Sequence, residues 1–178
     1  GGNGAPLPAD VVRYLHGSGI DRVVGGHVPH GDCPNVMVSG GVTVLTADTS
    51  YSDMGHLSEW GVDNRGAAVG QVVLCGDGSI KVDGVLRDGT TEYSYHLPCL
   101  QTARLPSAAS VASTSEFQEP YDWFVGKQLK DGRWVKARLR GEEANREYLL
   151  VRGEGFKLHV SYASSDELLG ELYRQQSR

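Results

Sequence analysis

The chain has 178 residues, a formal net charge of -5 and a pI near 5.6. That length suits one moderate domain or a domain with an appendage, and the acidic balance makes nucleic acid an unlikely main partner, because phosphate binding needs a basic face. No apolar run approaches the ~20 residues that span a bilayer, and we expect neither a signal peptide nor a membrane partner. The three cysteines form no CxxC pair, which favours a reducing, cytoplasmic compartment over a disulfide framework.

Glycine accounts for 24 residues, roughly twice its average usage, and this favours tight turns between strands over long helices. A short helix is expected to open at residues 8–10 and to end at Gly17 and Gly19. A buried strand at residues 20–24 then leads into a polar, glycine-rich loop at 25–32. Further strands are expected at residues 35–39, 42–47, 67–75, 79–85 and 90–97, with glycine turns at 40–41 and 76–78.

The composition changes after residue 98. Residues 99–119 contain a Ser/Ala-rich segment without a periodic apolar face, which predicts a linker. Residues 120–178 then predict a small, separable antiparallel β-module of about four strands with a C-terminal helix from residue 165.

Basic and aromatic residues alternate in this C-terminal module. Such a pattern can bind single-stranded nucleic acid, or it can be a strand with Trp134 on its core face and a solvated basic face, and we favour the second interpretation. The residues concerned are Lys127, Lys130, Arg133, Lys136, Arg138 and Arg140, with Trp123, Phe124 and Trp134 among them.

The strongest functional pattern lies where the strand at 20–24 ends. Residues 23–27 read Val-Val-Gly-Gly-His, and the two glycines let the backbone turn sharply so that the His27 imidazole can project from the strand end. Imidazole binds zinc, iron and manganese in sites that also use carboxylates. The polar segment at 48–65 is too long for a simple turn, and loops of that length are often functional. In it, Asp48 and Asp53 flank Tyr51 as a polar rim or as loop caps.

Three segments in this order resemble the last motifs of calcineurin-like metallophosphoesterases. Residues 23–31 resemble the Gly-His motif that follows a buried strand, and residues 41–51 resemble the strand and tyrosine-bearing loop of phosphoprotein phosphatases. Residues 64–68 resemble the next segment of that family. The resemblance covers roughly residues 9–87, about half of the chain. Many members of the superfamily have a second histidine two positions after the first, where this sequence has proline at position 29. In this respect the segment resembles the branch of phosphoprotein phosphatases and diadenosine-tetraphosphatase-like enzymes, which use only the first histidine.

The resemblance implies an α+β fold, in which residues 1–98 are the C-terminal part of a metallophosphoesterase β-sandwich flanked by a helix. It implies a metal-dependent phosphatase with two divalent ions (Mn, Fe or Zn) and a phosphorylated protein or nucleotide as substrate. His27 would bind one metal, and Tyr51 would contact the phosphate or shape its pocket. His30 either touches the substrate or is a loop histidine bonded to the backbone, and both interpretations stay open.

The family's other metal motifs precede the Gly-His motif, and none occurs in the twenty-six residues before His27. We therefore expect this chain alone to be inactive, with the N-terminal half of the same domain as its partner. The alternative is a non-catalytic, phosphoesterase-like module that binds partners through its basic and aromatic tail.

Overall fold

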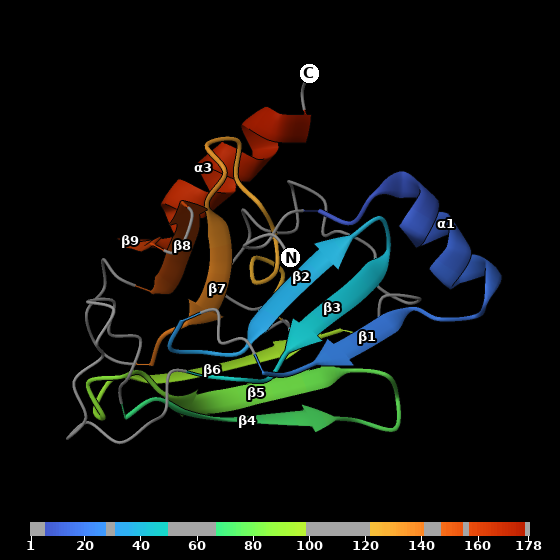
Figure 1. Cartoon of the computed structure of the whole chain (residues 1–178). Coiled ribbons are helices and arrows are strands. Elements are labelled where there is room, and N and C mark those ends of the chain that lie inside the picture. Colours follow the sequence, from blue (N-terminus) through green and yellow to red (C-terminus); the bar gives the residue numbers. More distant parts are fainter. Residues whose placement is uncertain are drawn as a thin grey trace.

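The fold consists of three small sheets and two helices, as seen in a computed structural model that describes residues 6–27, 31–49, 67–98, 122–140, 147–154 and 157–176. Helix α1 (Ala9–Gly17) precedes a mixed sheet of strands β1 (Arg22–Gly25), β2 (Asn35–Ser39) and β3 (Val42–Thr46), in the order β1-β3-β2 (Figure 1). Strand β1 is parallel to β3, whereas β2 and β3 form an antiparallel hairpin around Gly40 and Gly41. Both glycines have positive φ, which this turn requires.

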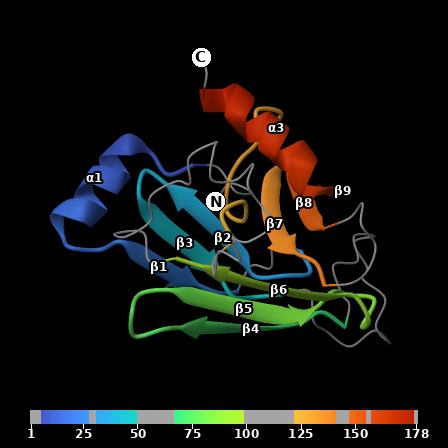
Figure 2. The same ribbon diagram turned by 180° about the vertical axis from the view of Figure 1, so that it is seen from behind.

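Two antiparallel sheets complete the chain. The second contains β4 (Val69–Leu74), β5 (Ile80–Val85) and β6 (Glu92–Leu97). The third contains β7 (Trp134–Arg138), β8 (Tyr148–Glu154) and β9 (Lys157–Ala163), followed by helix α3 (Ser165–Gln176). Figures 1 and 2, which show the molecule from opposite sides, place the first sheet over the second and the third beside both.

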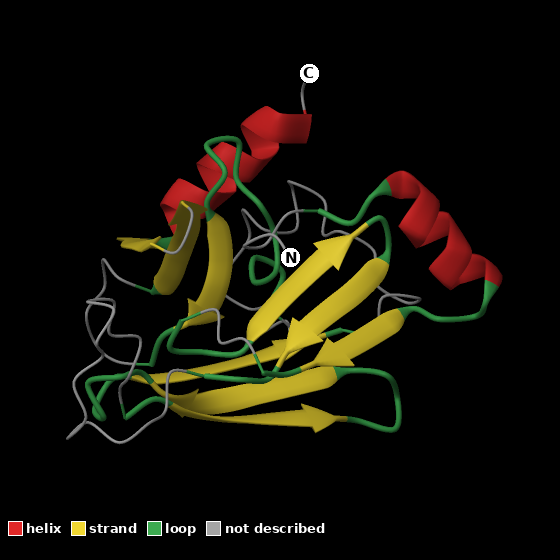
Figure 3. Cartoon of the chain, in the orientation of Figure 1, coloured by secondary structure: helices red, strands yellow, loops and turns green. Residues whose placement is uncertain are grey.

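The expected α+β metallophosphoesterase sandwich is wrong, because the described chain is mostly β (Figure 3). The two helices stand near the ends of the chain, and α1 buries none of its side chains, so it does not form a helical layer on a sheet. Short hairpins between glycine turns build three separate sheets. The strands of the first two sheets nevertheless lie within about two residues of their expected positions at both ends. In the C-terminal module, where about four strands were expected, the described residues form three strands, and Gln128 makes only an isolated bridge to Trp134.

One apolar core joins all three sheets. Val36 and Leu45 of the first sheet, Tyr93 of the second and Leu150 of the third belong to the same buried cluster. Hydrogen bonds also cross the expected module boundary, from the Asp122 amide to the His96 carbonyl and from the Arg140 amide to the Glu92 carbonyl. The separate stability of residues 120–178 stays a prediction.

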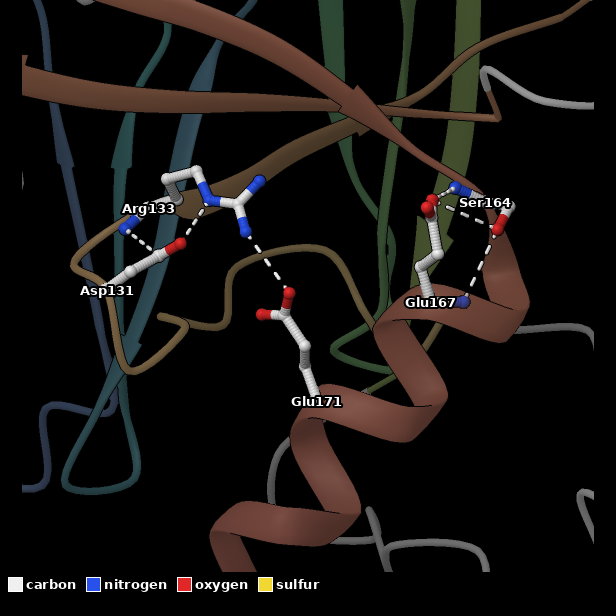
Figure 4. Close-up of polar contacts among 5 residues, drawn as sticks. All are labelled: Asp131, Arg133, Ser164, Glu167 and Glu171. Carbon is white, nitrogen blue, oxygen red and sulfur yellow. Dashed lines mark hydrogen bonds and ion pairs between the residues drawn. The ribbon is translucent and has the colours of Figure 1, made fainter.

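Helix α3 begins with a capping box. The Glu167 amide donates to the Ser164 hydroxyl at 3.3 Å, and the Ser164 amide donates back to the Glu167 carboxylate at 2.9 Å (Figure 4). The hydrogen bonds that the Glu167 carboxylate accepts from the Ser164 amide and the Ser164 hydroxyl lower the pKa of Glu167. One turn later, Glu171 accepts from Arg133, which also pairs with Asp131, so the helix is tied to the turn before β7.

We expect Ser164→Ala to lower the free energy of unfolding by about 1 kcal/mol, because it removes the acceptor for a helix N-terminal amide. Chemical denaturation of the variant measures this change. Ser18→Ala is the matched control, because Ser18 follows the C-terminal end of α1 and caps it through its backbone. Equal losses in the two variants would contradict a specific role for the capping box.

Candidate functional site

His27 lies two residues beyond the end of β1 with an exposed side chain. Its φ is 79°, and it is the single non-glycine residue with positive φ in the described part of the chain. An L-residue in this left-handed region carries a conformational cost of the order of 1 kcal/mol, and such strain is concentrated at functional sites. Neither Gly25 nor Gly26 has a positive φ, so the left-handed residue at this point is His27 itself and not either of the glycines before it.

Asp48 shares this edge of the first sheet with His27. Gly25 and Thr46 are the last paired residues of the parallel β1–β3 ladder, and the Ala47 amide extends it by donating to the Gly25 carbonyl at 3.1 Å. His27 and Asp48 each follow that last pair by two residues, so the register places an imidazole and a carboxylate at neighbouring strand ends. Ligands of sheets with parallel strands typically bind at this carboxyl edge.

Two contacts hold the segments around this edge. Asp32, three residues before β2, pairs with the Arg87 guanidinium at 2.7–2.8 Å and so connects the start of β2 to the turn after β5. Thr49, directly after Asp48, donates its hydroxyl to the Ala68 carbonyl at 3.0 Å. Asp32 before β2 and Thr49 after β3 therefore both contact the second sheet.

His30 and Tyr51 lie outside the described residues, so their expected roles stay predictions. His27 and Asp48 are a suitable donor pair for zinc, iron or manganese, because imidazole and carboxylate are ligands that these ions accept. A metal ion needs more than two ligands. In the part of the chain that the structure describes, no group of three or more His, Cys, Asp or Glu side chains could hold one.

A buried polar cluster lies at the same edge of the first sheet. It was not predicted from the sequence. Asn35, the first residue of β2, pairs with Thr46 and accepts a hydrogen bond from the Lys136 ammonium. Lys136 is 3% exposed and Asn35 is 4% exposed. Burial lowers the pKa of Lys136 to about 8, and burial also raises the pKa of the nearby Cys33 thiol to about 11.

A β-bulge explains the burial of Lys136. Val135 pairs with Leu150 and Ala137 pairs with Leu149, so Lys136 is an extra residue without a partner in the ladder. Residues 134–137 are consequently all buried, and the expected solvated face is wrong for Lys136. Lys136 is the one charged residue in the apolar run Trp-Val-Lys-Ala, and this was the feature of the sequence that could have indicated a buried lysine.

Other residues of the basic and aromatic tail are also engaged in the fold. Trp134 is 6% exposed, and Phe124 packs edge-on against Tyr148 with ring centroids 5.4 Å apart. Arg133 pairs with Asp131 and Glu171, and Arg140 lies 3.9 Å from the Glu92 carboxylate. Two of the tail's three expected aromatic side chains therefore contribute to packing, and two arginines already have acidic partners.

Comparison of the chain with protein-family models, curated proteins and solved structures found no match. Neither described helix is long and apolar enough to cross a membrane.

Proposed function

We propose that this chain contributes His27 to the metal site of a metal-dependent phosphatase that hydrolyses phosphate esters. The observation that carries the proposal is the position of His27, an exposed imidazole on strained backbone at the carboxyl edge of the β1–β3 pair. The resemblance of residues 23–31 to a metallophosphoesterase motif supports the same assignment, although the chain does not have the fold that it implied.

Each residue at this edge has a distinct part in the proposed site. His27 would donate a ring nitrogen to one of two divalent ions (Mn, Fe or Zn), and Asp48 would supply a second ligand or orient the imidazole through a hydrogen bond. Bound ions would activate water and stabilise charge on the phosphoryl group. The remaining ligands would come from outside the described residues or from a partner chain, such as the expected N-terminal half of the domain.

The proposed substrate is a phosphorylated protein or a dinucleoside polyphosphate. A non-catalytic module that binds through the tail is less well supported, because Trp134 and Lys136 are buried and Arg133 is paired with two carboxylates.

We expect His27→Ala to weaken the binding of Mn²⁺ or Zn²⁺ by at least about tenfold, because it removes a principal ligand. Isothermal titration of each ion into the chain measures this loss. His159→Ala is the matched control, since His159 is an exposed histidine on β9 of the third sheet. Unchanged metal affinity in His27→Ala, or an equal loss in His159→Ala, would contradict the proposed ligand.

Hydrolysis of p-nitrophenyl phosphate in the presence of Mn²⁺ provides the activity measurement. The chain alone is expected to show no turnover above that of Mn²⁺ itself, because two ligands do not hold a dinuclear centre. Turnover that survives the His27→Ala substitution would contradict the proposed role of His27.

A further inference from the structure

Strand β4 forms an exposed edge of the second sheet. The sheet order is β4-β5-β6, so β4 has a ladder partner on one side only among the described strands. Val69, Val73 and Leu74 are 53%, 38% and 48% exposed, which is high for large apolar side chains on a strand. Val69, Gln71 and Val73 share the outer face of the sheet, since side chains alternate along a strand.

The hydrogen bonds of β4 show which backbone groups face outward. The Ala67 amide donates to the Arg87 carbonyl and the Cys75 amide donates to the Ser79 carbonyl, so the odd-numbered residues bond inward to β5. In an antiparallel ladder the alternate residues then direct their N–H and C=O groups away from the partner. Gly70, Val72 and Leu74 therefore present these groups at the outer edge.

Within its own six residues, β4 has none of the sequence features that usually protect an edge strand. Natural edge strands carry charges, prolines, bulges or a very short length. The six residues of β4 include no ionisable side chain and no proline, and their register with β5 is continuous. By contrast, β1 has four residues and contains Arg22, and β9 contains Lys157 and His159.

We propose that β4 pairs with β4 of a second copy of this chain, in an antiparallel, two-fold symmetric dimer centred on Gln71. The sequence around that centre is self-complementary, because the register places Val69 opposite Val73 of the partner and Gln71 opposite Gln71 of the partner. No like charges meet across the strand pair. The two three-stranded sheets would form one continuous sheet, with the four valines in an apolar stripe on its outer face.

The outward backbone groups fit the same register. Gly70 would exchange both backbone hydrogen bonds with Val72 of the partner, since both residues face the edge. The Gln71 pair then occupies a non-hydrogen-bonded position, where side chains of opposing residues lie closest. At its Ala68 end the edge is partly occupied, because the Ala68 carbonyl accepts from Thr49, so the pairing is confined to residues 69–73 around Gln71.

Sedimentation equilibrium of the whole chain tests the dimer, with Gln71→Lys as the variant. We expect a concentration-dependent dimer for the unchanged chain and a dissociation constant raised about tenfold or more for Gln71→Lys, because two lysines would face each other. Within one chain Gln71 pairs with Asp83, so the lysine should leave the fold intact. His159→Lys, which adds the same charge to the edge strand β9, should not affect the dimer.

Cysteine cross-linking tests the register independently. In the proposed pairing Gln71→Cys brings two thiols opposite each other on the two-fold axis, whereas Val69→Cys places its thiol opposite a valine. Under mild oxidation Gln71→Cys should therefore form a covalent dimer well ahead of Val69→Cys and of the unchanged chain. The proposal is overturned if the unchanged chain is monomeric up to millimolar concentration, if Gln71→Lys still dimerises as tightly, or if both cysteine variants cross-link equally.

Discussion

Replacement of Gly84 by alanine should lower the free energy of unfolding by about 3 kcal/mol, because the position has no room for a side chain. Gly84 pairs across the ladder with Tyr93, whose ring is fully buried in the shared core. A Cβ at this position would overlap the backbone carbonyl oxygen of Val69 and the Tyr93 hydroxyl, and would lie 2.7 Å from Tyr93 Cζ. The carbonyl belongs to the neighbouring strand and cannot rotate away.

Thermal unfolding measures this effect. A loss of about 3 kcal/mol corresponds to a fall in Tm of roughly 6–12 °C for a chain of this size. Gly76→Ala is the matched control, because the same added methyl group at Gly76, in the β4–β5 turn, would meet no described atom within 4 Å. Similar Tm values for the two variants would show that the second sheet can relax around Gly84 and that the packing described for Tyr93 is wrong.

Replacement of Asn35 by alanine should cost about 2–3 kcal/mol of unfolding free energy, because it leaves the buried Lys136 ammonium without its hydrogen-bond acceptor. No ion pair involves Lys136 within the described ranges, so the described residues offer no carboxylate as a substitute. Lys136→Met should cost less than Asn35→Ala, since it removes the buried charge and leaves only the neutral Asn35 amide oxygen without its donor.

The double variant distinguishes this explanation from a simple loss of packing. Once Lys136 is methionine, the change of Asn35 to alanine should cost clearly less than it does in the unchanged chain, since no charge remains to be satisfied. Chemical denaturation of the four proteins measures the difference. Strictly additive losses would contradict the assignment of the cost to the ammonium group.

The pH dependence provides a second readout of Lys136. Its folded pKa of about 8 lies below the usual 10.5, so above pH 7 the unfolded state binds more protons than the folded state. Stability therefore rises with pH across this window, by about 1 kcal/mol between pH 7 and 9. Lys136→Met should lack this gain. The raised pKa of Cys33 acts in the opposite direction, but only above about pH 9, where its unfolded thiol ionises.

Local features of the sequence predicted the strand positions well. Glycine turns bound the hairpins at Gly40-Gly41 and around Gly78, and each of these glycines has positive φ in the structure. The apolar pattern between these turns then predicts where each strand begins and ends. The expected strand at residues 35–39 coincides with β2 for this reason.

The assembly of these strands could not be predicted in the same way. The parallel pairing of β1 with β3, and the packing of all three sheets on one core, depend on contacts between segments far apart in the chain. The bulge at Lys136 is a further example, since strict alternation along β7 would place Lys136 on the opposite face from Val135 and Ala137, whereas all three are buried. The resemblance to metallophosphoesterases led to an α+β sandwich, and it could not show that these segments form three separate sheets.

The candidate site was predicted in part. His27 was found because a Gly-Gly pair after an apolar strand is a local pattern, and its neighbour Asp48 was left open between a polar rim and a loop cap. The placement of both residues at one edge of the first sheet depends on the β1–β3 register. Asn35 and Lys136 are 101 residues apart in the sequence, which is why the buried cluster at this edge was not anticipated.

Paramagnetic broadening by Mn²⁺ tests the central claim most directly, because it detects weak ion binding and locates it along the chain. In amide-detected NMR spectra of the whole chain, we expect substoichiometric Mn²⁺ to broaden the resonances of residues 25–27 and 47–49 first, and His27→Ala to remove this effect. Broadening that is instead strongest at acidic turns such as those of Asp77 or Asp88, or that is unchanged in His27→Ala, would contradict a metal site at the carboxyl edge of β1 and β3.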